Sequence, residues 1–148
     1  MSFYCSCEHA ELTPWSVIFG YAHLDDKTHD YPYLEQTVHI NVERATVWYQ
    51  SYRATSDSIS AHQSTIDDYL DLPVGMYEAL QIAEDNGGRE VRSGATGYCE
   101  IRGGLGGLRN EGEWEVGYVV FTEDKSQSEW VLRVGIDATT GKARVISD

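Results

Sequence analysis

Basic residues are scarce in this sequence. Its 11 Lys and Arg residues stand against 24 Asp and Glu residues, which gives a formal net charge of −13. A chain of this charge repels the phosphates of nucleic acids and the headgroups of anionic membranes. We therefore expect no nucleic-acid partner. The same charge is compatible with an alternative function, that of an acidic protein-interaction factor of the inhibitor, immunity or DNA-mimic type.

Long apolar segments are also absent. No run approaches the roughly 20 residues that a membrane-spanning helix requires, and residues 1–14 lack the basic start and apolar stretch of a signal peptide. We therefore predict a cytoplasmic protein that does not insert into membranes. Export stays an open alternative if a signal peptide was removed from the parent chain.

Cysteine is limited to Cys5, Cys7 and Cys99, and an odd number does not give a complete disulfide framework. Cys5 and Cys7 are too close together for an ordinary structural bridge. A C-x-C pair could bind a metal with other ligands, but the sequence has no second Cys pair. Our interpretation is a flexible N-terminus with free thiols and a Cys99 that fills the core.

Catalytic motifs are lacking too. The sequence has no G-x-S-x-G nucleophile elbow, no zincin spacing and no phosphate loop with G-K-[ST]. Metal-ligating residue types gather in HLDDKTHD, where His23, Asp25 and His29 are the candidate ligands, although a solvated loop explains the same residues. We therefore predict a non-enzymatic protein without a cofactor. A small metal-dependent enzyme is the second alternative.

Aromatic residues are well represented, with ten Tyr, four Trp and three Phe. Aromatic and β-branched residues favour strands, so we expect β-sheet to dominate. A length of 148 residues fits one domain. We predict a disordered lead-in over residues 1–13 and a single α+β domain over residues 14–148. That domain could comprise two halves, a β-rich part over 14–55 and a helix with a β-meander over 64–148.

Apolar periodicity predicts the secondary structure along the chain, most clearly in the C-terminal half. Met76, Leu80 and Ala83 recur at helical spacing, and Gly87-Gly88 is typical of a helix end, so a helix is predicted over about 76–86. Alternating apolar residues predict strands over 15–24, 38–42, 46–50, 95–102, 113–121, 130–136 and 142–146. A turn over residues 137–142 would join the last two strands. The pattern predicts an antiparallel β-sheet packed against one principal α-helix.

Three segments of this half follow one another as a helix, a strand with Trp-x-Val and a strand that ends in an Asp-x-x-x-Gly turn. They are EALQIAEDNGG (Glu78–Gly88), WEVGYVV (Trp114–Val120) and LRVGIDATTGKARVI (Leu132–Ile146). Through them, residues 74–148 resemble a PepSY-like domain. The resemblance implies an α+β fold of cystatin-like character. It also implies a binding or regulatory module without shared catalytic residues.

Two features predict a binding surface for a protein or peptide. Trp48 and Tyr49 are neighbours on a predicted strand, so they point to opposite faces and one of them stays half exposed unless it is covered. The glycine-rich stretch GGLGG is a flexible connection that could move when a partner binds. The candidate binding residues are Trp48, Tyr49, Gly103, Gly104, Gly106 and Gly107. An open sheet edge would also permit homodimerisation.

Overall fold

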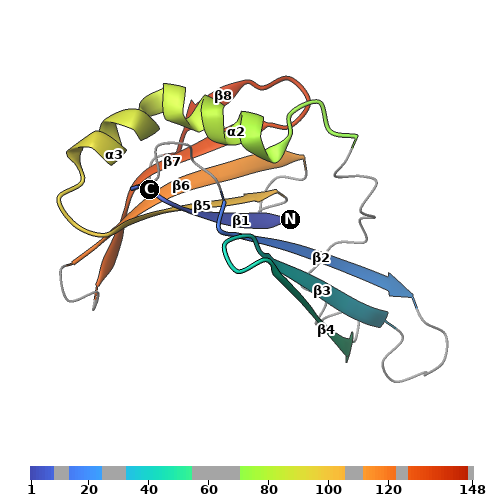
Figure 1. The fold of residues 1–148 in the computed structure, drawn as a ribbon. Coiled ribbons are helices and arrows are strands. Elements are labelled where there is room, and N and C mark those ends of the chain that lie inside the picture. Colours follow the sequence, from blue (N-terminus) through green and yellow to red (C-terminus); the bar gives the residue numbers. More distant parts are fainter. Residues whose placement is uncertain (9–13, 25–32, 55–70, 106–111, 123–126, 147–148) are drawn as a thin grey trace.

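A computed structural model describes residues 1–8, 14–24, 33–54, 71–105, 112–122 and 127–146. Eight strands form one antiparallel sheet, and a bent helix lies along one face of its C-terminal part (Figure 1). This arrangement confirms the predicted α+β class with a single principal helix. Strands from both parts of the chain join the same sheet.

The sheet has the strand order β4-β3-β2-β1-β5-β6-β7-β8. The strands are β1 (Ser2–Ser6), β2 (Ser16–Leu24), β3 (Tyr33–Asn41), β4 (Thr46–Ala54), β5 (Cys99–Leu105), β6 (Glu113–Phe121), β7 (Ser128–Asp137) and β8 (Ala143–Val145). The predicted strand over residues 113–121 coincides with β6. The predicted hairpin at the C-terminus corresponds to β7 and β8.

The N-terminal strand β1 lies in the middle of the sheet. It pairs with β2 through three residue pairs on one side and with β5 through five on the other. The prediction of a disordered lead-in is therefore wrong for residues 2–6, while residues 9–13 lie outside the described residues. Alternation of buried Phe3 and Cys5 with half-buried neighbours is the pattern of a strand, in a segment too short to give a clear periodic signal.

The helix begins at Met76 and continues beyond its predicted end. It comprises α2 (Met76–Ala83), a wide turn η2 (Glu84–Gly88) and α3 (Arg89–Gly94). Gly87 has the predicted left-handed conformation, with φ of 111°. The chain then re-enters helical geometry at Gly88, so Gly87 produces a bend and not a C-terminus.

The core lies between this helix and the sheet. Ala79, Leu80 and Ala83 are the buried residues of α2, and Trp114 and Tyr118 of β6 are fully buried. The Trp114 Nε1–H donates a hydrogen bond of 2.9 Å to the Val74 carbonyl, which fixes the segment before α2 on the sheet. Burial of these large side chains stabilises the fold by roughly 1.5–3 kcal/mol each.

The turn between β7 and β8 has the chemistry that its sequence predicts. The Asp137 carboxylate accepts hydrogen bonds from the backbone N–H groups of Thr139 and Thr140, at 3.0 and 2.7 Å. These bonds favour the charged form and lower the pKa of Asp137. Gly141 supplies the positive φ that closes the turn.

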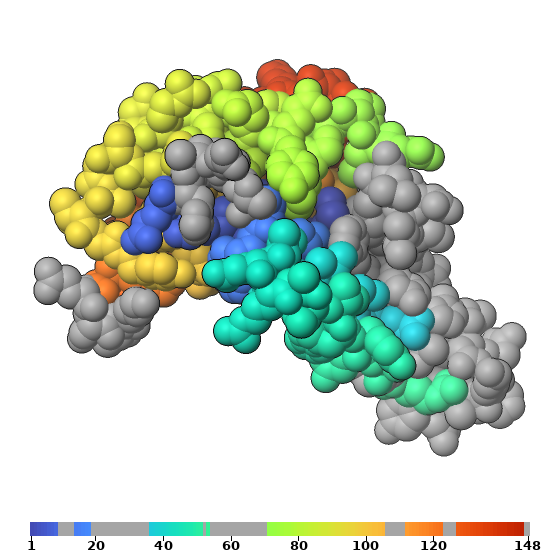
Figure 2. Space-filling view, viewed as in Figure 1, coloured from blue at the N-terminus to red at the C-terminus, as the bar shows by residue number. Residues whose placement is uncertain are grey.

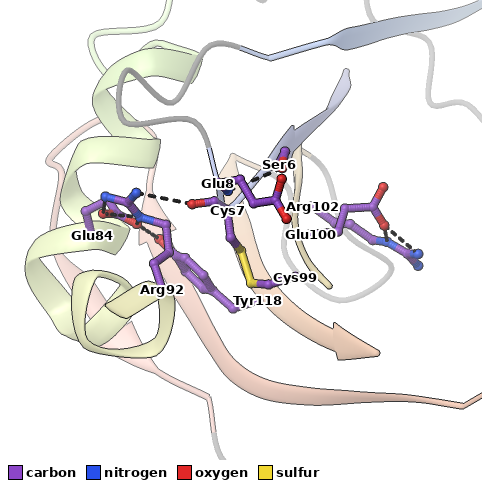
Figure 3. Close-up of a disulfide and its surroundings, with 9 residues drawn as sticks. All are labelled: Ser6, Cys7, Glu8, Glu84, Arg92, Cys99, Glu100, Arg102 and Tyr118. Carbon is purple, nitrogen blue, oxygen red and sulfur yellow. Dashed lines mark hydrogen bonds and ion pairs between the residues drawn. A yellow bond between two sulfur atoms is a disulfide. The ribbon is translucent and has the colours of Figure 1, made fainter. Parts of the chain in front are cut away.

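A disulfide joins Cys7, just after β1, to Cys99 at the start of β5 (Figure 3). The prediction of free thiols is therefore wrong for these two residues, although Cys99 is buried on a strand as expected. Their separation of 92 residues hides the pairing from any local pattern. The Cys5 thiol is buried, and burial, with the charge of Glu84 as a smaller cause, raises its pKa to about 12.

Within the described part of the chain, no helix is long and apolar enough to cross a membrane.

The disulfide should contribute much of the stability, because it closes a loop of about ninety residues in the unfolded chain. We expect Cys7→Ala combined with Cys99→Ala to lower the free energy of unfolding by about 2–4 kcal/mol. Urea unfolding monitored by tryptophan fluorescence measures the change. The wild type in reductant should reproduce it, and equal stability of oxidised wild type and double variant would contradict the bond's role.

Candidate functional site

An arm of three strands extends from the main body of the sheet. Strand β2 pairs with β3 along nine residue pairs, but only Ser16, Val17 and Ile18 of β2 also pair with β1. Residues 19–24 therefore continue past β1. Figure 1 shows β3 and β4 at the lower end of the sheet with the helix above its other part, and in Figure 2 their described residues form the lower part of the molecule. The described helix makes its main strand contacts with β6, β7 and β8, in the C-terminal part of the sheet.

Strand β4 is the outer edge of this arm, and its large apolar side chains face water. Val47, Trp48 and Tyr49 have exposed fractions of 66%, 51% and 76%. Because successive residues of a strand point to opposite faces, this exposure means that both faces of β4 are uncovered there. Sequence reasoning expects only one member of the Trp48–Tyr49 pair to be half exposed, whereas both are. We call Thr46–Ala54 the β4 edge.

Contacts within the arm hold the β4 edge against β3. Strands β3 and β4 pair in continuous register over nine residue pairs, from Asn41 opposite Thr46 to Tyr33 opposite Ala54. Trp48 stacks on His39 of β3, with ring centroids 3.6 Å apart and an interplanar angle of 7°. The stack orients the indole while half of its surface stays open to solvent.

Backbone hydrogen bonds attach the base of the arm to β1. The Val42 N–H donates to the Trp15 carbonyl, and the Trp15 N–H donates to the Tyr4 carbonyl, both at 2.9 Å. The Trp15 and Tyr4 rings are in contact, with centroids 5.7 Å apart. The position of the β4 edge therefore depends on β1.

The candidate glycines are divided between β5 and undescribed residues. Gly103 and Gly104 are part of β5 and not of a loop, while Gly106 and Gly107 lie outside the described residues. Gly103 is buried, and a Cβ there would meet the Phe3 ring at 2.1 Å. Gly103 therefore serves packing of the core: its missing side chain makes room for Phe3.

The structure does not show whether the candidate metal ligands His23, Asp25 and His29 lie close together. Asp25 and His29 lie outside the described residues, and only the backbone of His23, on β2, is described. Among the residues that the structure describes, no group of three or more His, Cys, Asp or Glu side chains could hold a metal ion.

The face of β5–β8 opposite the helix carries charge pairs that sequence reasoning missed. Three arginine–glutamate pairs lie on it: Arg102–Glu100, Arg133–Glu115 and Arg144–Glu113, at 2.7–2.8 Å. The Trp130 ring lies between Arg102 and Arg133, each 5.9 Å from the ring centroid. Gly117 allows this contact, since a Cβ would meet the ring at 2.2 Å. Each of these three arginines is paired with a carboxylate, so the pairs carry no net charge.

A buried polar cluster joins the bent helix to the disulfide region. Glu84 is 2% exposed, forms an ion pair of 2.6 Å with Arg92, and accepts a 2.7 Å hydrogen bond from the Tyr118 hydroxyl. Arg92 also donates to the Cys7 carbonyl (Figure 3). Gly88 permits the approach of Tyr118, because a Cβ would overlap its hydroxyl.

This cluster is a structural connection and not a reactive centre. Burial and the bond to Glu84 raise the pKa of Tyr118 well above its ordinary value, so the phenol stays protonated. No buried side-chain N or O atom in the described part of the chain lacks a hydrogen-bond partner. The β4 edge is therefore the best candidate for a functional site.

Comparison of the chain with protein-family models, with curated proteins and with solved structures returns no match.

The packing role of Gly103 gives a direct test. We expect Gly103→Ala to lower the free energy of unfolding by about 1–3 kcal/mol, because the fully buried Phe3 must move. Gly104→Ala is the matched control, since its nearest neighbour would be an ordinary contact at 3.8 Å. Thermal or urea unfolding measures both, and equal effects would contradict the role assigned to Gly103.

A second test compares two carboxylates on the bent helix. We expect Glu84→Gln to lower stability by about 3 kcal/mol, because Arg92 would remain partly buried without its ion-pair partner. Asp85→Asn removes the same charge from an exposed pair with Arg89 and should change stability by less than about 0.5 kcal/mol. Similar losses in the two variants would show that Glu84 does not carry the structural role.

Proposed function

We propose that this protein is a non-enzymatic binding module that holds an extended segment of a protein partner along the β4 edge. The observation that carries the proposal is the exposure of Val47, Trp48 and Tyr49 on an edge strand. An edge strand presents unpaired backbone N–H and C=O groups, and natural proteins usually protect long apolar edges. The β4 edge contains no proline and no acidic residue that would provide such protection.

Strand addition supplies the physical basis of binding. An added strand forms backbone hydrogen bonds with the edge, and side chains on alternate positions provide specificity. On one face it would contact Trp48, which is already oriented by His39, and on the other Tyr49. Exposed aromatic side chains with limited freedom are the residue types that dominate binding energy in interfaces.

The resemblance of residues 74–148 to PepSY-like domains supports the same class of function, a binding or regulatory module. In this proposal the C-terminal half forms the framework, and the arm from the N-terminal half provides the contact surface. The alternative of an acidic interaction factor is supported by the net charge of −13 alone. The alternative of a metal-dependent enzyme depends on His23, Asp25 and His29, whose side chains lie outside the described structure.

The compartment is part of the proposal. The cytoplasmic assignment stays a prediction from sequence. The Cys7–Cys99 disulfide favours an oxidising compartment instead, since stable disulfides are rare in the cytosol. We propose that the module functions outside the cytoplasm.

A site-specific crosslink tests the binding edge. With the photoreactive residue benzoylphenylalanine in place of Tyr49, irradiation in extracts of the native host should yield a covalent product with one partner protein. The same replacement at Tyr77 is the control, because Tyr77 is 63% exposed and belongs to α2, not to the arm. Equal products from both positions, or a product from position 77 alone, would contradict the proposal.

Alanine substitution tests the energetics with the partner so identified. We expect Trp48→Ala with Tyr49→Ala to weaken binding by about 2 kcal/mol or more, while Tyr77→Ala leaves it unchanged. Calorimetry at two salt concentrations separates the alternatives. Binding through packed side chains and backbone hydrogen bonds should change little with salt, whereas binding by an acidic factor should weaken steeply.

A further inference from the structure

We propose that a second copy of this chain covers the β4 edge, so that two β4 strands pair antiparallel around a two-fold axis. The inference rests on the proposed function, because both place the partner on the same edge, and it names that partner. A strand edge is well suited to this role. In an antiparallel pair of identical strands, each contact made by one copy is repeated by the other.

Repulsion between two acidic copies is weakest where the surface has no acidic side chains, as along β4. Two chains of net charge −13 repel each other, so a contact between them needs a surface without acidic side chains. Strand β4 has none, and Arg53 is its one charged residue. Its neighbour β3 has a single acidic residue, Glu35. Acidic groups beyond about 8 Å are largely screened at physiological ionic strength.

Apolar exposure favours the same contact. Val47, Trp48 and Tyr49 lie in the first half of β4, and the two-fold axis of an antiparallel pair brings the first half of one strand beside the second half of the other. Val47, Trp48 and Tyr49 of each copy would then lose part of their contact with water beside the other strand. The interface would belong to the small size class, so a concentration-dependent equilibrium is expected, not an obligate dimer.

The opposite edge of the sheet favours a closed dimer over a chain of molecules. Strand β8 has only three residues, and its central residue Arg144 forms an ion pair with Glu113. Among the described strands, β4 and β8 are the two ends of the sheet. A short edge offers few backbone groups to a nine-residue strand, so pairing of β4 with β8 of another copy is disfavoured.

Sedimentation velocity of the full-length chain tests the inference, from roughly 1 to 200 µM at about 0.15 M salt. We expect the dimer fraction to rise with concentration. Tyr49 lies one position from Gln50, the middle residue of β4, so its two copies would come close to the axis. Tyr49→Glu and Tyr49→Lys should therefore each raise the dissociation constant roughly tenfold or more, by like-charge repulsion.

Mixing the two variants provides a readout that misfolding would not reproduce. Glu from one copy would face Lys from the other, so the mixture should form a dimer more readily than either variant alone. Tyr77→Glu is the control and should dimerise as the wild type does. Circular dichroism verifies the fold of each variant.

Several results would overturn the inference. They are a monomeric wild type across the concentration range, a dimer unaffected by both Tyr49 substitutions, or absence of recovery in the mixture. A monomer that still crosslinks to a different protein through position 49 would overturn the dimer and leave the proposed function standing. A dimer with no crosslink to another protein would support the dimer and contradict a heterologous partner.

Discussion

The structure depends on the insertion of β1 between β2 and β5. This five-residue strand is the link between the arm and the body of the sheet, since β2 and β5 pair with it from opposite sides. The Cys7–Cys99 disulfide fixes its end to β5, and Phe3 fills the space left by Gly103. Loss of β1 would separate the helix-covered strands from the arm that carries Trp48 and Tyr49.

Two parts of the molecule therefore meet different physical requirements. The C-terminal strands bury Trp114, Val116 and Tyr118 beneath the helix and supply the core. The β4 edge leaves Val47, Trp48 and Tyr49 in water, which is unfavourable for an isolated protein and becomes favourable when a partner covers them. Pairing with β3 holds the exposed edge in a fixed register without burying Val47, Trp48 and Tyr49.

Local patterns in the sequence predict the C-terminal half well. Helical spacing of Met76, Leu80 and Ala83 identifies the start of the helix, and alternation with a Gly turn identifies β6, β7 and β8. The helix end is misplaced because Gly87 can bend a helix as readily as end it, and the pairing of Glu84 with Arg92 and Tyr118 holds the chain on the sheet beyond the bend.

Sequence patterns do not predict the non-local features of the fold, and the reason is the same for each. Strand β1, the disulfide and the role of Gly103 all depend on residues more than ninety positions apart, which no periodic pattern connects. Trp48 and Tyr49 are neighbours on a strand, as the alternation predicts. Their joint exposure follows from the position of β4 at the sheet edge, and strand order cannot be derived from alternation.

Amide hydrogen exchange resolved by residue, on protein dilute enough to be monomeric, tests most directly whether β4 is an open edge. If β4 is an open edge, amides of β1, β5 and β6 exchange slowly, and in β4 only the alternate amides that face β3 are protected. Slow exchange at every amide of residues 46–54 in the monomer would show that the chain covers its own edge, and would contradict the account.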